Sequence, residues 1–303
     1  MDKLITRASS INRALDQIGD KWCLLIIQEV FWGINSFNDM MAATGVSRGV
    51  LSNRLKWLQS VDCLERRPEP GGGRRYRYHL TEKSLDLYQC ALMALVWERR
   101  HFGTPAPEDL VLRHLSCGHA FEPVLRCAAC DGTVSVRDVS YHPGPGATRD
   151  ERDKKVRRRS SIPVSSVPAG RGVYLNLVNL VGDRWTANVI ALALHGLKRF
   201  EEFNRELPVA TNILSNRLKI LVAEGILTQV PYQDAPRRYE YQLTPMGEDM
   251  FPWFLTLLQW GDRWCDPVGA GRPMRLLHER CGHDLQGRVR CSECGEDLRA
   301  REV

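Results

Sequence analysis

The sequence has no apolar run that approaches the ~18 residues needed by a membrane-spanning helix. Its first ten residues, MDKLITRASS, are polar where a signal peptide needs an apolar stretch. It also has no phosphate-binding glycine loop and no serine, histidine and acid arrangement of the kind that hydrolases use. These absences argue against a membrane protein, a secreted protein and an enzyme. We therefore expect a cytoplasmic protein without catalytic activity.

An excess of acidic charge is also missing. The chain has 42 lysines and arginines against 36 acidic residues, a net charge of +6 and a pI of about 8.8. This mildly basic balance fits a nucleic-acid partner without requiring one. At 303 residues and 43% hydrophobic, the chain is long enough for two or more domains. Ten cysteines in a reducing compartment favour metal or thiol chemistry over disulfides.

Three sequence blocks occur twice, each pair separated by 163 positions. LSNRLK stands at 51–56 and again at 214–219. IGDKW at 18–22 matches VGDRW at 181–185, and RRYRYHLT at 74–81 matches RRYEYQLT from residue 237. A constant offset without gaps indicates a duplicated unit of about 100 residues, and such a repeat outranks other signals of architecture.

Within one repeat, apolar spacing and turn residues predict a defined order of elements. Helices are expected at 11–19, 21–32, 37–43, 47–60 and 81–100, with strands at 64–67 and 75–80. Helices followed by a two-stranded hairpin are the order of a winged helix-turn-helix, and the second repeat has the same order over 173–264. The predicted fold class is mainly α with small β wings (α+β).

The helix at 47–60 has one apolar side, where Val50, Leu51, Leu55 and Leu58 gather. The opposite side carries donors suited to phosphates and base edges, on a rod that fits a major groove. A solvated polar face is the alternative, but wing arginines beside a glycine-rich loop favour double-stranded DNA. The predicted DNA-binding residues are Ser47, Arg48, Ser52, Asn53, Lys56, Arg74, Arg75, Thr211, Asn212, Ser215, Asn216, Lys219, Arg237 and Arg238.

Arg54 lies near the apolar side of this helix, as Arg217 does in the second repeat. A buried arginine needs an acidic partner. Asp39 and Glu202, at matching positions in the preceding helices, are the candidate partners, and both arginines are interpreted as structural.

Four segments of the first repeat, ALDQIGDKWCLLIIQEV, SFNDM, VLSNRLKWL and RYRYHLTEKS, resemble the HxlR-type family of bacterial winged-helix transcriptional regulators. The resemblance covers about 95 residues of each half. It implies DNA binding through the helix at 47–60 and a two-fold dimer formed by the helices that flank the core. Relatives usually have a single unit, so the duplication is a departure from the family.

The helix at 47–60 and its counterpart in the second repeat are called the reading helices, because they are expected to contact DNA bases. A tandem chain can present both of them without a second subunit. Arg48 and Gly49 of the first helix become Thr211 and Asn212 in the second, at the end where base contacts usually fall. We therefore expect an intramolecular pseudo-dimer that reads an imperfect palindrome with unequal half-sites. A homodimer with four reading helices is the alternative.

Each winged helix is followed by a cluster of potential metal ligands, spaced as two pairs with nine residues between them. This spacing is typical of a zinc ribbon that holds one structural, tetrahedral Zn²⁺. The first predicted site comprises His114, Cys117, Cys127 and Cys130, and the second comprises His278, Cys281, Cys291 and Cys294. Modules of under 40 residues could hardly fold without such a metal.

The expected boundaries follow from these features. Winged helices occupy 1–110 and 173–268, and zinc-ribbon-like modules occupy 111–139 and 269–303. Residues 140–172, rich in Pro, Gly, Ser and basic side chains, are expected to form a flexible linker.

Several alternatives stay open. His119 and His283 can replace His114 and His278 as ligands, or the cysteines can be a relic or form disulfides under oxidation. The ribbons can belong to a protein-interaction scaffold that does not read DNA. A small-molecule effector can bind among aromatic residues near the dimerising helices, although aromatics at helical spacing are usually core. These aromatic residues are Trp22, Trp32, Trp185, Trp253 and Trp260.

Overall fold

The computed structural model describes residues 3–69, 75–103, 110–153 and 173–303. The chain forms two compact units, and neither is continuous in sequence. The N-repeat unit comprises residues 15–124, 159–183 and 289–303, and the C-repeat unit comprises residues 1–14, 125–158 and 184–288. Each unit thus combines the winged helix of one repeat with segments of the other. The prediction of consecutive, self-contained domains is wrong in this respect.

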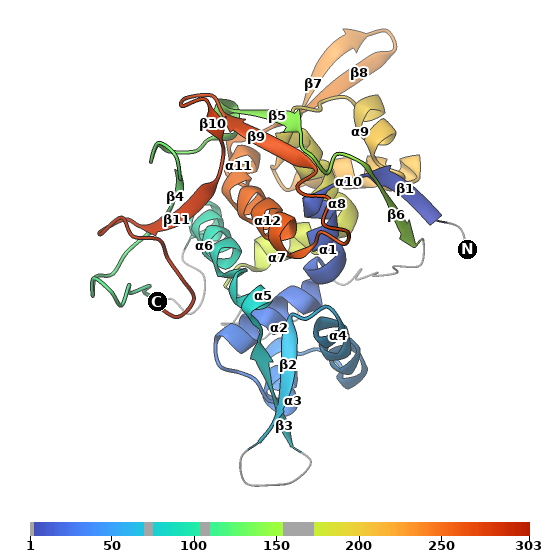
Figure 1. The fold of residues 1–303 in the computed structure, drawn as a ribbon. Coiled ribbons are helices and arrows are strands. Elements are labelled where there is room, and N and C mark those ends of the chain that lie inside the picture. Colours follow the sequence, from blue (N-terminus) through green and yellow to red (C-terminus); the bar gives the residue numbers. More distant parts are fainter. Residues whose placement is uncertain (1–2, 70–74, 104–109, 154–172) are drawn as a thin grey trace. The chain divides into compact units, whose positions relative to one another are not determined.

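The winged helix of the N-repeat unit has the predicted order of elements (Figure 1). Its helices are α2 (Lys21–Phe31), α3 (Phe37–Thr44), α4 (Arg48–Ser60), α5 (Glu82–Leu85) and α6 (Tyr88–Phe102), and its wing strands are β2 (Leu64–Pro68) and β3 (Tyr76–Leu80). Helix α1 (Ser10–Ile18) precedes them, and α7 (Leu175–Val181) belongs to the same unit. The predicted last helix is divided in two between α5 and α6.

The C-repeat unit repeats this order with a longer wing. Its winged helix comprises α8 (Arg184–Leu194), α9 (Phe200–Glu206), α10 (Thr211–Ala223), β7 (Leu227–Asp234), β8 (Arg237–Leu243), α11 (Pro245–Glu248) and α12 (Phe251–Trp264). The unit also contains β1 (Lys3–Arg7), a short 3-10 helix (Val136–Asp138), β5 (Val139–Pro143), β6 (Arg149–Asp153), β9 (Met274–His278) and β10 (His283–Asp284). Strands β4 (Pro123–Cys127) and β11 (Gly287–Cys291) pair in a two-stranded sheet.

Side-chain caps fix where helices α2 and α3 begin. Asp20 caps α2 by accepting from the backbone N–H groups of Trp22 and Cys23, and Ser36 caps α3 by accepting from that of Asp39. Helix α3 ends at Gly45, whose φ of +67° lies in the left-handed region that favours glycine. Caps and glycine together set the turn that leads into α4.

The cores follow the apolar spacing of the sequence. In α4, Leu51, Leu55 and Leu58 are buried as predicted, whereas Val50 is half-exposed. Trp97 of α6 and Trp260 of α12 are among the largest fully buried side chains. None of the described helices is long and apolar enough to cross a membrane.

Helix α7 comes from the second repeat but packs on α2 and α6 of the first. The Glu98 carboxylate of α6 accepts from the backbone N–H groups of Asn176 and Leu177, at distances of 3.1 and 3.2 Å. These groups lie at the start of α7, where unpaired donors and the helix dipole favour a negative charge. Burial nevertheless raises the pKa of Glu98, although these hydrogen bonds oppose the rise.

Two strands occupy the beginning of the predicted linker. Strand β5 pairs antiparallel with β9, from Val139 opposite His278 to Pro143 opposite Met274, and β6 pairs with β1. The prediction of a flexible linker is therefore wrong for residues 140–153. Residues 154–172 of the predicted linker lie outside the described residues.

Arg54 is structural, but its predicted partner was wrong. Its guanidinium donates to both oxygens of Asp20, at 2.7 and 3.0 Å, and the Asp20 side chain is only 1% exposed. Asp39 instead accepts from the Ser36 hydroxyl. Glu202, the candidate partner of Arg217, accepts from the backbone N–H groups of Lys198 and Arg199.

Replacing Arg54 with alanine is expected to destabilise the protein by about 3 kcal/mol, because the buried Asp20 charge loses its partner. Urea denaturation followed by circular dichroism measures the change. The matched control is Asn53→Ala on the neighbouring exposed position, expected within about 0.5 kcal/mol of the unsubstituted protein. Equal effects of the two substitutions would contradict a structural role for the Arg54–Asp20 pair.

Candidate nucleic-acid interface and metal centres

Helix α4 presents the predicted polar face to solvent. Ser47, Arg48, Asn53 and Lys56 are exposed, and Ser52 is half-exposed. Ser47 occupies the N-cap position but makes no side-chain capping hydrogen bond, so its hydroxyl is not used by the helix. Five groups capable of hydrogen bonding thus lie on the side opposite the buried leucines.

Helix α10 presents the same pattern in the C-repeat unit. Thr211, Asn212, Asn216 and Lys219 are exposed, and Ser215 is half-exposed. The buried side of α10 consists of Leu214, Leu218 and Leu221, the counterparts of the buried leucines of α4. The two helices therefore have equivalent residues on their core side and on part of their exposed side.

The two helices differ at their N-terminal ends. The Arg48 guanidinium lies over the Phe37 ring, 5.4 Å from its centroid. This cation–π contact orients the arginine at the start of α4. Thr211 stands at the matching place in α10, and the next residue, Asn212, accepts from the backbone N–H of Ile213. The first turns of α4 and α10 consequently offer different donors.

The wings place some of the predicted arginines in solvent. Arg75, Arg237 and Arg238 are exposed, whereas Arg74 lies outside the described residues. Arg77 is instead tied to its own unit, donating to Glu69 at 2.7 Å and to Asn35 at 3.0 Å. The wing strands thus leave Arg75 and the Arg237–Arg238 pair available to a partner.

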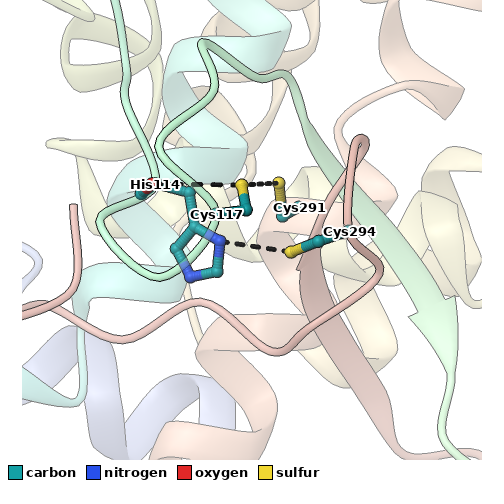
Figure 2. A group of neighbouring side chains, drawn as sticks. All are labelled: His114, Cys117, Cys291 and Cys294. Carbon is teal, nitrogen blue, oxygen red and sulfur yellow. Dashed lines mark hydrogen bonds between the residues drawn. The ribbon is translucent and has the colours of Figure 1, made fainter.

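The eight predicted metal ligands form two clusters, but not in the predicted groups. His114 and Cys117 meet Cys291 and Cys294 in the N-repeat unit, as Figure 2 shows. Cys127, Cys130, His278 and Cys281 meet in the C-repeat unit. The predicted grouping of ligands within each repeat is therefore wrong. Each cluster takes a His-x2-Cys pair from one repeat and a Cys-x2-Cys pair from the other.

The spacing of the ligand atoms suits a tetrahedral ion. In each cluster the candidate ligand atoms all lie within 4.8 Å of one another. The Sγ atoms of Cys117 and Cys291 are 4.0 Å apart, and Cys294 Sγ lies 3.3 Å from His114 Nδ1. Bonds of about 2.3 Å to sulfur and about 2.0 Å to nitrogen put the corners of a tetrahedral zinc site about 3.5–3.8 Å apart. The two distances lie on either side of this range, so small shifts of the side chains would bring these atoms to the corners of a tetrahedral site.

Tight turns hold each ligand pair. The backbone N–H of Gly118 donates to His114 O at 2.7 Å, and that of Gly295 donates to Cys291 O at 3.0 Å. The other cluster has the same turns, with Gly282 donating to His278 O and Asp131 donating to Cys127 O. These four backbone turns bring the two ligands of each pair to the same cluster.

None of the ten cysteines forms a disulfide, so the cysteines of both clusters have sulfur atoms that can bind a metal ion. A hydrogen bond from the Gly132 backbone is the main cause that lowers the pKa of the Cys130 thiol. Burial alone would raise the pKa of Cys291, but backbone hydrogen bonds involving Cys294 and Glu293 contribute to a net lowering. Backbone hydrogen bonds involving His283 and Glu296 lower the pKa of Cys281 and of Cys294, respectively, but burial and the neighbouring cysteines give both a net rise. Each cluster therefore contains one thiol of lowered pKa, which favours the thiolate that a metal ion binds, and one of raised pKa.

The histidines of the clusters are fully buried, and their Nδ1 atoms face the sulfurs. Nε2 of His114 and of His278 has no hydrogen-bond partner among the described residues. Metal-binding histidines usually donate this second N–H to a carboxylate, a carbonyl or water. The two cluster histidines have no such hydrogen bond to a described residue. His119 and His283, the alternative ligands, are both exposed and lie outside the clusters.

The tryptophans considered for an effector pocket do not share one environment. Trp253 and Trp260 are buried in the core, Trp22 and Trp185 are half-buried, and Trp32 is exposed. A small cavity in the C-repeat unit is lined by aliphatic residues together with Tyr141, His195, Phe251 and Phe254, and by no tryptophan. The described residues therefore give no aromatic pocket built from these tryptophans.

Comparison with known proteins gives a family match in both repeats. The HxlR-like helix-turn-helix family matches residues 17–104 and 180–268. An uncharacterised HTH-type transcriptional regulator of Mycobacterium tuberculosis, Rv3095, is 40% identical over 126 residues, which are 42% of this chain and 79% of that protein. The regulator YvaP of Bacillus subtilis is 34% identical over 91 residues, covering 30% of this chain and 84% of its own length.

Two solved structures also align with this chain. One is the putative transcription factor PA1607, at 30% identity, with a TM-score of 0.39 over 46% of this chain and 93% of that protein. The other is the redox regulator HypR in its reduced form, at 30% identity, with a TM-score of 0.28 over 29% of this chain and 88% of that protein.

Removing bound metal with a chelator is expected to lower the midpoint of thermal unfolding by more than about 5 °C, because metal binding contributes to folding stability. Circular dichroism melting with and without the chelator, together with metal analysis of the purified protein, tests this. Adding back Zn²⁺ should restore the original midpoint. An unchanged melting curve after complete chelation would contradict metal-dependent folding of these segments.

Proposed function

We propose that this chain, which belongs to the HxlR-like helix-turn-helix family, is a DNA-binding transcriptional regulator that reads an imperfect palindrome through α4 and α10. The relatives are named as HTH-type transcriptional regulators. The observation that carries the proposal is the pair of exposed polar faces on α4 and α10. Each face lies opposite buried leucines.

The residue types on these faces suit major-groove recognition. Asn53 and Asn216 are exposed amides, and an asparagine side chain can pair with two atoms of an adenine edge. Lys56 and Lys219, one helical turn further on, have the charge to contact phosphates. Because these residues recur in both repeats, we assign them the contacts that the two half-sites share.

The first turns of the helices supply the difference between the half-sites. Arg48 can donate two hydrogen bonds to a guanine, whereas Thr211 and Asn212 offer shorter side chains. The cation–π contact with Phe37 holds the arginine at the start of α4. In each half-site, some base pairs are thus contacted by residues common to both helices, and others by residues found in only one of them.

Phosphate contacts from the wings complete the proposed interface. Arg75 in one wing and Arg237 and Arg238 in the other are exposed cations on hairpins that follow the reading helix. Such contacts position a protein on DNA without specifying sequence. We assign the wings to affinity and the two reading helices to specificity.

One chain contains both reading helices, so we propose an intramolecular pseudo-dimer as the DNA-binding form. The relative Rv3095 supports this, because 126 residues make up 79% of its length and it is therefore about half as long as this chain. A chain with two family matches carries the reading helices that two such shorter subunits would supply.

We also propose that the two clusters hold structural Zn²⁺. Three sulfurs and one imidazole nitrogen are a ligand set typical of closed zinc sites, in which no position remains for a substrate. The proposed role is to stabilise the segments around the clusters, not to catalyse a reaction.

Exchanging the first turn of α4 for that of α10, by Arg48→Thr with Gly49→Asn, is expected to change the preferred base pairs in one half-site only. Selection of binding sites from random DNA, before and after the exchange, measures this. Wild-type selection should give two unequal half-sites, and the exchanged protein two more similar ones. Retention of the original preferred site would contradict readout by these residues.

Lys56→Ala and Lys219→Ala are each expected to weaken binding about equally for all sequences and to reduce the salt slope by about 1, since one phosphate contact is lost. Fluorescence anisotropy across a salt series gives both quantities. Arg299→Ala is the control, because Arg299 is an exposed cation outside the reading helices and wings. If this control and the lysine variants lose affinity equally, the assignment of the lysines fails.

A further inference from the structure

Each metal cluster is made from chain segments on both sides of residues 154–172. We propose that each cluster binds one Zn²⁺ that fastens a segment of one repeat to the winged helix of the other, so that neither repeat can complete a zinc site with its own ligands in the folded protein. The inference rests on the proposed zinc binding, but it does not depend on DNA recognition.

In the N-repeat unit, the fastened segment is the C-terminal stretch 289–303. Besides the pairing of β11 with β4, three described hydrogen bonds from backbone or serine groups join it to residues 110–124. Ser292 N–H donates to Glu122 O at 3.1 Å, Glu122 N–H donates to Ser292 Oγ at 3.0 Å, and Leu115 N–H donates to Glu302 O at 2.8 Å. Exposed hydrogen bonds of this kind contribute little net stability.

The same stretch buries little apolar surface. Of residues 289–303, only Val289, Cys291 and Leu298 are buried, and Cys291 is itself a ligand. The burial of two apolar side chains is small against the conformational entropy that is lost when the whole stretch is ordered. A metal ion held by His114 and Cys117 on one side and Cys291 and Cys294 on the other supplies the missing stability.

In the C-repeat unit, the segment that comes from the first repeat, residues 125–153 of the described chain, makes more backbone contacts with the rest of the unit. Besides the cluster of Cys127, Cys130, His278 and Cys281, five residue pairs join β5 to β9. Ala128 N–H also donates to Gln286 O at 2.8 Å, and Glu279 N–H donates to Asp138 O at 2.8 Å. The metal in this unit therefore adds to an existing backbone ladder. Removing the metal ion should therefore increase amide exchange less in this unit than in the N-repeat unit.

The alternative is a pair of ordinary ribbons, each using four ligands of its own repeat. Two double substitutions in the full-length chain separate the arrangements. Cys117→Ala with Cys294→Ala removes two ligands from one cluster of the structure, but one ligand from each ordinary ribbon. Cys117→Ala with Cys130→Ala does the reverse.

The measurement is zinc content per chain after purification and dialysis, by atomic emission. The expected content is two ions in the unsubstituted protein, one in C117A/C294A and none in C117A/C130A. The matched control is H119A/H283A, which changes the two nearby exposed histidines and should retain two ions. The reversed pattern, equal losses in the two cysteine variants, or no zinc in the unsubstituted protein overturns the proposal.

Hydrogen exchange supplies a second test that remains valid if C117A/C130A does not fold. In C117A/C294A, amide exchange should rise at least about tenfold in both 110–124 and 289–303, while β5 and β9 stay protected. A rise confined to one of the two segments overturns the proposal. Because neither experiment contains DNA, failure to bind DNA would refute the proposed regulator function and leave this result standing.

Discussion

The pairing of a His-x2-Cys turn from one repeat with a Cys-x2-Cys turn from the other is the constraint on which the rest of this structure depends. It requires the segments that follow α6 and α12 to meet in both units, so each unit must contain chain from both halves. Helix α7 is another segment of the second repeat that lies in the N-repeat unit. It packs on α2 and α6, and the Glu98 carboxylate accepts from backbone N–H groups at its start. Duplication has therefore produced an interwoven chain instead of two successive domains.

Because one chain contains both proposed reading helices, α4 and α10 can differ in sequence, and this affects which DNA sites the protein can recognise. The core sides of α4 and α10 retain the same leucine pattern, while their first turns differ. In a homodimer, a substitution in the reading helix would alter both half-sites together. In a tandem chain, one helix can change while the other remains fixed. The contrast between Arg48 and Thr211 is the kind of difference that such freedom permits.

Much of the local structure could be predicted from the sequence, because capping residues, apolar periodicity and turn glycines act over a few residues. The apolar spacing of Leu51, Leu55 and Leu58 placed the core side of α4 correctly. What could not be predicted depends on residues far apart. Asp20 is 34 positions from Arg54, and Cys291 is 174 positions from Cys117. Spacing showed that the cysteines form ligand pairs, but it is identical in the exchanged and ordinary arrangements.

The most direct test of the account is the number of chains bound to one selected DNA site. A stoichiometric anisotropy titration at low salt, checked by sedimentation velocity, gives this number for a duplex with both half-sites and for a scrambled duplex. The account predicts one chain per duplex, specific binding that weakens steeply with salt, and protection of both half-sites. Two chains per duplex, or equal affinity for the scrambled DNA, would contradict an intramolecular pseudo-dimer that reads a palindrome.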